Sequence, residues 1–598
     1  MIETTLISLG RLAFQLGWIA ALLLGLGRAA VGLLGFGSLA GYWRLGLAAV
    51  AGAAVVNLAV QAAMLAGWVS RLGFQILGMV LLAGAMMAWG LLRPRLRESL
   101  RGGWQAWRPQ AAVMAAPLLA IATNLIIAAA PSTKIDELYY HMLAPKRLLE
   151  DRALVAYLEP FPASALPQMQ FQYSQALAHA WGQPDAGNLA SMVLSLALAA
   201  WLYGFCRETT GSRPVALLLA SAVPVGLYAA VHHTSSGPHA LGDLAVALAA
   251  VAMLQTERLA GRVGAWRAVA SGALCAAVGA STKLSLWPLA ALITLIMAWR
   301  LHRRGSRMAI VLAAIAPWLI CQGPMLALSW RLTGSPFGPF FFGQVFGAGP
   351  PAELAAEIAN SRIVNQGGPL AALRDLVVNV PPVVPLAALA LLWPRRGGFT
   401  ARGWLLGLVA VQLALIGIAL PHHFRFLSGL IFAVVAAAAM HWAGSPAIEW
   451  LERHSRLACL VSLGGWLGAQ LFYAAPFAKV FTGVVGRQEF IGRYVALAAD
   501  FRALDTVLPA NAVLLTEGRL PALYAPRAVV FTWRDLHGRP PVYYLAQGEG
   551  KRETGPLACE TGIYSNPNAV VMTFRNPLRA PVRGAVRVYR CRWREERP

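Results

Sequence analysis

Residues 45–68 read LGLAAVAGAAVVNLAVQAAMLAGW and contain no Asp, Glu, Lys or Arg. A helix rises 1.5 Å per residue, so a run of this length is long enough to cross the ~30 Å hydrocarbon core of a bilayer. Similar apolar runs recur along most of the chain. We expect about fourteen membrane-spanning helices, near residues 13–35, 45–68, 72–91, 110–130, 187–205, 214–231, 242–256, 268–283, 286–299, 308–328, 378–393, 403–420, 426–442 and 457–475.

The composition of the chain supports a polytopic membrane protein whose core is all-α. Of its 598 residues, 58% are hydrophobic and only 13% are charged, and the mean hydropathy is +0.57. In soluble proteins about a quarter of the residues are charged. The first apolar run is followed by further spans and not by a soluble domain, so we do not interpret it as a removable signal peptide.

The formal net charge of +24 reflects loop arginines more than a nucleic-acid partner, because no basic arm with interleaved aromatic residues is present. The arginines gather in alternate loops, which predicts that these loops are cytoplasmic: Arg44; Arg93, Arg95, Arg97, Arg101 and Arg108; Arg207 and Arg213; Arg258, Arg262 and Arg267; Arg300, Arg303, Arg304 and Arg307; Arg395, Arg396 and Arg402; Arg453 and Arg456. The segments 131–186, 329–377 and 476–598 then lie outside. We expect the protein to lie in a bacterial inner membrane, with these three segments in the periplasm.

Three regions follow from this pattern. Residues 1–109 form extra N-terminal helices, residues 110–475 form the transmembrane core, and residues 476–598 form a small periplasmic α/β domain. Strands are expected in that domain at 513–518, 528–533, 568–574 and 586–593. Its two cysteines, Cys559 and Cys591, lie in an oxidising compartment, which predicts a disulfide that stabilises the domain by roughly 3 kcal/mol.

Asp136 and Glu137 follow the expected fourth span directly. Adjacent carboxylates at the outer face of a membrane can act as a general base or hold a cation against a phosphate, although two solvated loop acids would look the same. His141 lies four residues after Glu137, so the two share one face if the segment is helical. Lys146 and Arg147 add positive charge nearby.

The run DELYYHMLAPK (136–146) resembles the first outer loop of the GT-C glycosyltransferases, the superfamily of protein O-mannosyltransferases and lipid A aminoarabinose transferases. Further pieces resemble its bacterial branch in order: GASTK (279–283), LTGSPFGPF (332–340) with Ser335 where Asn is usual, and HHFRFL (422–427). Asp243 stands where a second acid is common. The resemblance covers roughly residues 110–540 and implies a GT-C-like core.

The resemblance also implies an activity, namely sugar transfer with inversion from a polyprenyl-phosphate donor to a glycolipid, polysaccharide or protein. Asp136 would be the base and Glu137 its partner. Lys283 and Arg425 are charges in otherwise uncharged short outer loops, where a cation is costly unless it is used, so both are candidates to bind the donor phosphate; snorkelling to the head groups is the alternative. His141, Lys146 and Asp243 are further candidate substrate contacts.

A divalent metal is a further possibility. Histidine and carboxylate suit zinc or manganese, and the candidate ligands are Glu137, His141, His232, His233 and His239. The alternative is that these side chains contact substrate or water. No organic cofactor is expected. The expected partners are the lipid bilayer, the polyprenyl-phosphate-linked sugar and its acceptor.

Three other functions remain open from the sequence. A transporter or flippase for a lipid-linked saccharide would also need many spans, but two similar halves would favour it and none is seen. An O-antigen ligase or polymerase would depend on outer Arg and His residues, which the histidine-rich loop keeps possible. A non-catalytic assembly subunit with a decayed site is the third.

Overall fold

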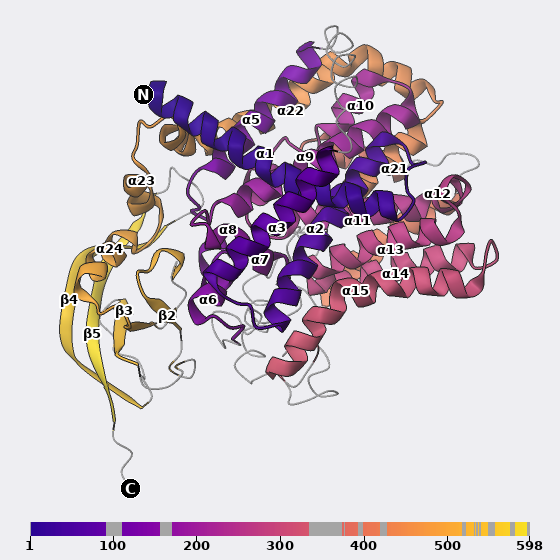
Figure 1. Cartoon of the computed structure of the whole chain (residues 1–598). Coiled ribbons are helices and arrows are strands. Elements are labelled where there is room, and N and C mark those ends of the chain that lie inside the picture. The colour runs from indigo at the N-terminus through magenta and orange to yellow at the C-terminus, as the bar shows by residue number, and fades with distance from the viewer. Residues whose placement is uncertain are drawn as a thin grey trace.

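The computed structural model describes residues 2–90, 111–155, 170–333, 336, 374–392, 399–418 and 427–594, with gaps at 135, 376 and 428 and in the loops at 517–521, 532–539, 548–555 and 574–579. A helical bundle is followed by a small domain built on one sheet, which lies beside one end of the bundle (Figure 1). The predicted combination of an all-α bundle and a small C-terminal domain with a sheet is therefore present.

Most helices of the bundle overlap the apolar runs of the sequence. They are α1 (Ile2–Leu33), α2 (Gly41–Leu65), α3 (Arg71–Gly90), α5 (Ala111–Ala129), α9 (Ala186–Thr210), α10 (Arg213–Ala220), α11 (His239–Leu254), α12 (Thr256–Val263), α13 (Ala265–Thr282), α14 (Trp287–Leu301), α15 (Arg307–Thr333), α19 (Val383–Leu392), α20 (Phe399–Ile418), α21 (Leu430–Trp442) and α22 (Pro446–Phe481). Within the described residues, 5 helices are long and apolar enough to cross a membrane, or up to 7 if each of two sharply bent pairs is one span. Helices that could span a membrane are thus present. Their lengths support five to seven spans among the described residues and do not establish the expected fourteen.

The expected span at 214–231 is wrong as a single helix. Helix α10 ends at Ala220, turns follow, and the chain then forms one π-helical turn, η5 (Ala229–His233). Pro224 lacks an N–H to donate within a helix, and Gly226 has a φ of +101° that suits glycine. His233 nevertheless returns to Ser195 of α9, with 2.9 Å between Nδ1 and Oγ, so the chain runs back along α9 in broken form.

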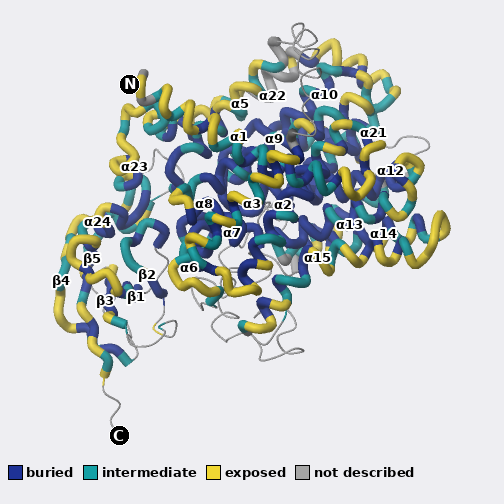
Figure 2. The backbone as a smooth tube through the Cα atoms, in the orientation of Figure 1, coloured by how far each residue is buried: buried dark blue, intermediate teal, exposed yellow. Residues whose placement is uncertain are grey.

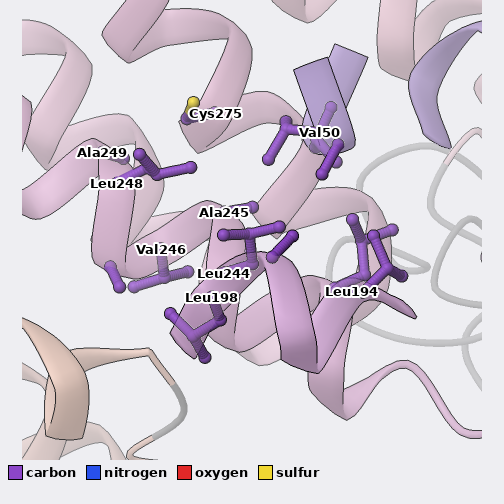
Figure 3. Close-up of a cluster of buried hydrophobic side chains, with 14 of the residues drawn as sticks. Val50, Leu194, Leu198, Leu244, Ala245, Val246, Leu248, Ala249 and Cys275 are labelled. Atoms are coloured by element: carbon purple, nitrogen blue, oxygen red, sulfur yellow. The ribbon is translucent and has the colours of Figure 1, made fainter. Parts of the chain in front are cut away.

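Helix α11 lies at the centre of the bundle, and all of its residues are buried. A helix that is apolar on every side belongs inside a protein. Its neighbours include α2, α9 and α13, and Figure 3 shows Leu244, Leu248 and Cys275 in the cluster of side chains between them. Figure 2 shows the same gathering of buried chain in the middle of the bundle.

Helices α1 and α2 approach each other through glycines. A Cβ atom at Gly27 would lie 1.6 Å from the carbonyl oxygen of Ala48, and one at Gly52 would lie 1.8 Å from that of Leu23. Backbones this close are typical of small-residue interfaces between membrane helices. The first two helices are therefore a tightly packed pair.

The C-terminal domain contains α23 (Arg487–Tyr494), α24 (Ala498–Val507) and five strands, β1 (Val513–Thr516), β2 (Ala528–Val530), β3 (Val542–Gln547), β4 (Leu557–Met572) and β5 (Val582–Trp593). The strand order is β2-β1-β3-β5-β4, parallel from β2 to β3 and antiparallel from β3 to β4. The four expected strands all occur, and β3 is an additional one. Cys559 and Cys591 pair in register across β4 and β5, with Cα atoms 4.0 Å apart, and form the predicted disulfide.

The two ends of the bundle differ in charge. Glu208 at the end of α9 binds Arg258 and Arg262 at 2.6 and 3.1 Å. The C-terminal domain contacts the opposite end, where Arg487 pairs with Asp185 just before α9. Because α9 has 25 residues, these ends lie about 37 Å apart along its axis. The arginine-rich loops near residues 207 and 258 therefore lie on the far side from the domain, as the loop pattern predicts.

Candidate active site

Two π-helical turns meet at the end of the bundle that carries the C-terminal domain. The first, η2 (Glu137–His141), holds the predicted acidic residue, and the second is η5. Such turns are rare and often occur at functional sites. The ammonium group of Lys134 joins them, since its Nζ donates to both the backbone oxygen and Oγ1 of Thr234 at 2.7 Å.

Glu137 is fully buried. Its Oε1 accepts a hydrogen bond from the backbone N–H of Ser236 at 2.9 Å and lies 3.6 Å from the ammonium of Lys134. Its Oε2 has no hydrogen-bond partner among the described residues. Burial raises the pKa of Glu137, and the charge of Lys134 opposes that shift. The hydroxyl of Ser235 and the N–H of Ser236 also lower this pKa, and Oε2 is the oxygen left without a hydrogen bond among the described residues.

Other buried polar atoms in the same region also lack a partner within the described part of the chain. They are Ser132 Oγ, Gln172 Oε1, Gln175 Oε1, His179 Nε2, Asp185 Oδ1, Asn188 Oδ1 and Ser236 Oγ. Folded proteins pair more than about 90% of such groups with protein or water. Most of these atoms are oxygens that accept hydrogen bonds. We call these residues, together with Glu137 and Lys134, the Glu137 cluster. Its oxygens suit a bound molecule that donates hydrogen bonds, such as water or a sugar, or a cation that oxygen lone pairs can bind.

Several predicted site residues lie beside this cluster. Nδ1 of His141 is 3.1 Å from Nε2 of Gln172. Gly237 separates His141 from His239, because a Cβ there would lie 3.1 Å from Nε2 of the first ring and 3.2 Å from Cδ2 of the second. The ammonium of Lys283 is 3.0 Å from Nδ1 of His239, and the ring of His232 is 4.5 Å from that of His239. The structure thus brings Glu137, His141 and Lys283 into one neighbourhood.

Asp243 and His233, both candidate site residues from the sequence, are bound to each other and to other parts of the protein. Oδ2 of Asp243 accepts from the hydroxyl of Tyr228 at 2.7 Å and is 2.9 Å from Nε2 of His233, and its Oδ1 accepts from the N–H of Gly429 at 2.6 Å. The other ring nitrogen of His233 is bound to Ser195. Both residues are fully buried. The polar atoms of this Asp243 network are bound within the protein, so the network ties η5, α11 and α21 together; the predicted substrate and metal contacts of these two residues stay predictions.

Lys146, a candidate substrate contact from the sequence, is bound to the C-terminal domain. Its Nζ donates to the backbone oxygens of Ala522, Leu523 and Ala525 in the C-terminal domain, at 3.4, 3.2 and 3.0 Å. The neighbouring Arg147 donates to the backbone oxygen of Val529. Both cations lie on α6 (Leu143–Asp151). They hold the C-terminal domain against the first outer segment.

The C-terminal domain closes over the Glu137 cluster through residues that the sequence did not single out. The hydroxyl of Tyr524 donates to the backbone oxygen of Ser132 at 3.1 Å, and Arg487 pairs with Asp185. Burial and the carboxylate of Asp185 raise the pKa of Tyr524, and Glu137 adds to the effect. Only the folded chain shows this, because more than three hundred residues separate Arg487 and Tyr524 from the acids that they approach.

Asp136 precedes η2 and is partly exposed; its backbone is helical and its side chain does not cap the turn. Arg425 and residues 334, 335 and 337–340 lie outside the described residues. Among the residues that are described, no group of three or more His, Cys, Asp and Glu side chains is arranged to hold a metal ion. A metal held by Glu137, His141 and the histidines at 232, 233 and 239 thus stays a prediction from sequence.

No protein-family model matches the chain, and no curated protein is significantly similar to it. A function is therefore proposed from the chemistry of the Glu137 cluster together with the sequence motifs.

Proposed function

We propose that this protein is a membrane glycosyltransferase of the GT-C type. It moves a sugar from a polyprenyl-phosphate donor to a glycolipid, polysaccharide or protein acceptor on the periplasmic face of a bacterial inner membrane. The observation that carries the proposal is the Glu137 cluster, a buried acidic site with unpaired oxygen acceptors at one end of an apolar helical bundle. A sugar supplies the hydroxyl donors that such acceptors need.

Asp136 and Glu137 have different roles because they differ in exposure to solvent. Asp136 is partly exposed, so an acceptor hydroxyl can reach it, whereas Glu137 is fully buried and anchored. Asp136 takes the proton of the hydroxyl as its oxygen attacks the anomeric carbon. The bond from that carbon to the phosphate oxygen breaks with its electron pair, and the anomeric configuration inverts. Glu137 fixes the turn that carries Asp136 and offers Oε2 to a hydroxyl or a cation.

Cations are needed where the polyprenyl phosphate leaves. Lys283 is partly exposed and lies within the same neighbourhood through His239 and Gly237. An ammonium group there stabilises the charge that develops on the leaving phosphate. Arg425 is proposed for the same task from the sequence motif. The long apolar helices support a location in the membrane, where the lipid part of the donor would reside.

Asp136→Asn tests the proposal because it keeps the size and hydrogen bonding of the side chain and removes the base. Transfer of a labelled sugar from isoprenoid-phosphate donors is measured with purified protein in lipid. We expect the rate to fall by about 10²–10⁴ while the melting temperature stays the same. Asp151→Asn, at an exposed acid of the same outer segment, is the matched control and keeps its activity.

Full activity of Asp136→Asn would remove that residue from the mechanism, and full activity of Glu137→Gln as well would refute the site. An O-antigen ligase would then be the better supported function. The specific observation that favours it is the group of His232, His239 and Lys283. Under that reading His239→Gln abolishes transfer whereas Asp136→Asn does not.

A further inference from the structure

A groove of about 430 Å³ lies between α1 and α3, beside the outer segment that leads into α9. Phe14, Trp18 and Ile19 line it from α1, and Met79 and Leu82 line it from α3. On α1 the lining residues follow the spacing of one helical face, from Arg11 through Gln15 to Trp18 and Ile19. Most of its wall is therefore hydrocarbon.

One end of the groove is polar. Arg11 and Gln15 on α1 both donate to Oε1 of Gln183, the latter bond measuring 3.0 Å. Arg11 is exposed, and a guanidinium has five N–H donors, so the bond to Gln183 uses only a part of its capacity. The groove thus has an apolar length and a cationic, amide-lined end.

The position of the groove fits a lipid. Gln183 lies two residues before Asp185, which pairs with Arg487 of the C-terminal domain, so the polar end faces the side of the bundle on which that domain lies. Trp181 is 48% exposed, and with Trp18 it marks the depth at which tryptophan meets lipid head groups. Phe14 and Met79 are 75% and 52% exposed. In a membrane such side chains face lipid chains.

The size and charge of the groove indicate which lipid occupies it. At roughly 30 Å³ for a group the size of a water molecule, the space accommodates about one hydrocarbon chain. A soluble metabolite would find few polar partners along such a wall. The exposed guanidinium favours an anionic head group over a zwitterionic one. Both contain a phosphate that can take two parallel hydrogen bonds from it, but the zwitterionic head group also carries a cation that the guanidinium repels.

We propose that this groove binds one chain of an anionic phospholipid of the leaflet on the side of the C-terminal domain, with the lipid phosphate on Arg11. This site is separate from the acidic cluster and does not depend on sugar transfer. The bound lipid joins α1 and α3 to the segment 178–186.

Native mass spectrometry of the full-length protein tests this proposal. The protein is exchanged into detergent with phosphatidylglycerol or with phosphatidylcholine of the same chains, and farnesyl phosphate serves as an isoprenoid competitor. We expect one phosphatidylglycerol to be retained at least tenfold better than phosphatidylcholine. Arg11→Gln removes that preference, and Arg28→Gln, at the other end of the same helix, keeps it.

A second pair of variants tests the groove itself. Gly78 lines it, and a Cβ there meets Nε1 of Trp181 at an ordinary 3.6 Å, so Gly78→Leu fills the space without a backbone clash. We expect this variant to lose the bound lipid, whereas Gly84→Leu, exposed on the same helix, retains it. Equal retention of the two phospholipids, or an unaltered Gly78→Leu, would overturn the proposal. Displacement by farnesyl phosphate at lower concentration than by phosphatidylglycerol would instead assign the groove to an isoprenoid substrate.

Discussion

The Glu137 cluster and the Asp243 network each contain a carboxylate with no exposed surface. One short loop contacts both, since Ser236 binds Glu137 and His233 binds Asp243. Asp243 uses both oxygens within the protein, on Tyr228, His233 and the backbone of Gly429. Glu137 uses one oxygen, and the described residues around it leave further acceptors unpaired. A buried carboxylate whose oxygens are all hydrogen-bonded within the protein stabilises the fold. A buried carboxylate with an unpaired oxygen is costly unless that oxygen binds water, a ligand or an ion.

The largest difference between the two regions should appear in stability. Asp243→Ala leaves three buried donors without an acceptor and should lower the free energy of unfolding by about 3–5 kcal/mol. Glu137→Gln keeps an oxygen for the N–H of Ser236, and Lys134 keeps its bonds to Thr234, so we expect a change within about 1 kcal/mol. Thermal unfolding of both variants in detergent measures the difference. Equal losses would erase the distinction between the two regions.

A smaller effect should follow from the disulfide between Cys559 and Cys591. Cys591→Ser should destabilise the C-terminal domain by about 3 kcal/mol, because the crosslink restricts its unfolded chain. That domain covers the Glu137 cluster and does not contact the Asp243 network through any bond described above. Hydrogen exchange should therefore rise in residues 134–141 and stay the same in residues 239–250. A uniform rise along both segments would show that the domain supports the whole bundle equally.

The smallest effect concerns pH. Burial raises the pKa of Glu137 above its ordinary value near 4.5, so the folded protein binds this proton more tightly than the unfolded chain does. Unfolding then releases a proton in the window between the two pKa values, and the free energy of unfolding falls as the pH rises through it, by up to about 1.4 kcal/mol per unit.

Melting temperatures of the wild type and of Glu137→Gln, compared from about pH 4.5 upward, isolate this contribution. The wild type should lose stability relative to the variant as the pH rises and then run parallel to it. A wild type that gains stability over the variant with rising pH would mean that Lys134 outweighs burial and that the carboxylate is a settled ion pair.

Local patterns in the sequence predicted most of the architecture. Apolar runs located most helices of the bundle, and strand patterns located four strands of the C-terminal domain. Its disulfide was predicted because two cysteines lie in a domain expected in an oxidising compartment. The run at 214–231 failed because Pro224 and Gly226 break a segment whose hydropathy alone looks continuous. Strand β3 escaped notice because its residues 542–546 are buried on both faces and show no alternation.

The candidate site was predictable only in part. Adjacency drew attention to Asp136 and Glu137, and an uncharged loop drew attention to Lys283. The charge of Lys146 suggested a substrate contact, and no local pattern predicted its partners in the structure, which are backbone oxygens of a domain more than three hundred residues away. Asp185, Arg487 and Tyr524 carry no local signal, since only the docking of that domain brings them to Glu137.

The Glu137 cluster should bind a polar molecule or an ion that is not part of the protein, and the Asp243 network should not. An electron cryo-microscopy map of the full chain in lipid nanodiscs, at a resolution that reveals ordered water, tests it most directly. We predict non-protein density within about 2.7–3.2 Å of Oε2 of Glu137 and Oδ1 of Asp185, and none inside the Asp243 network. Direct pairing of these two oxygens with protein donors, with no guest between them, would contradict the claim.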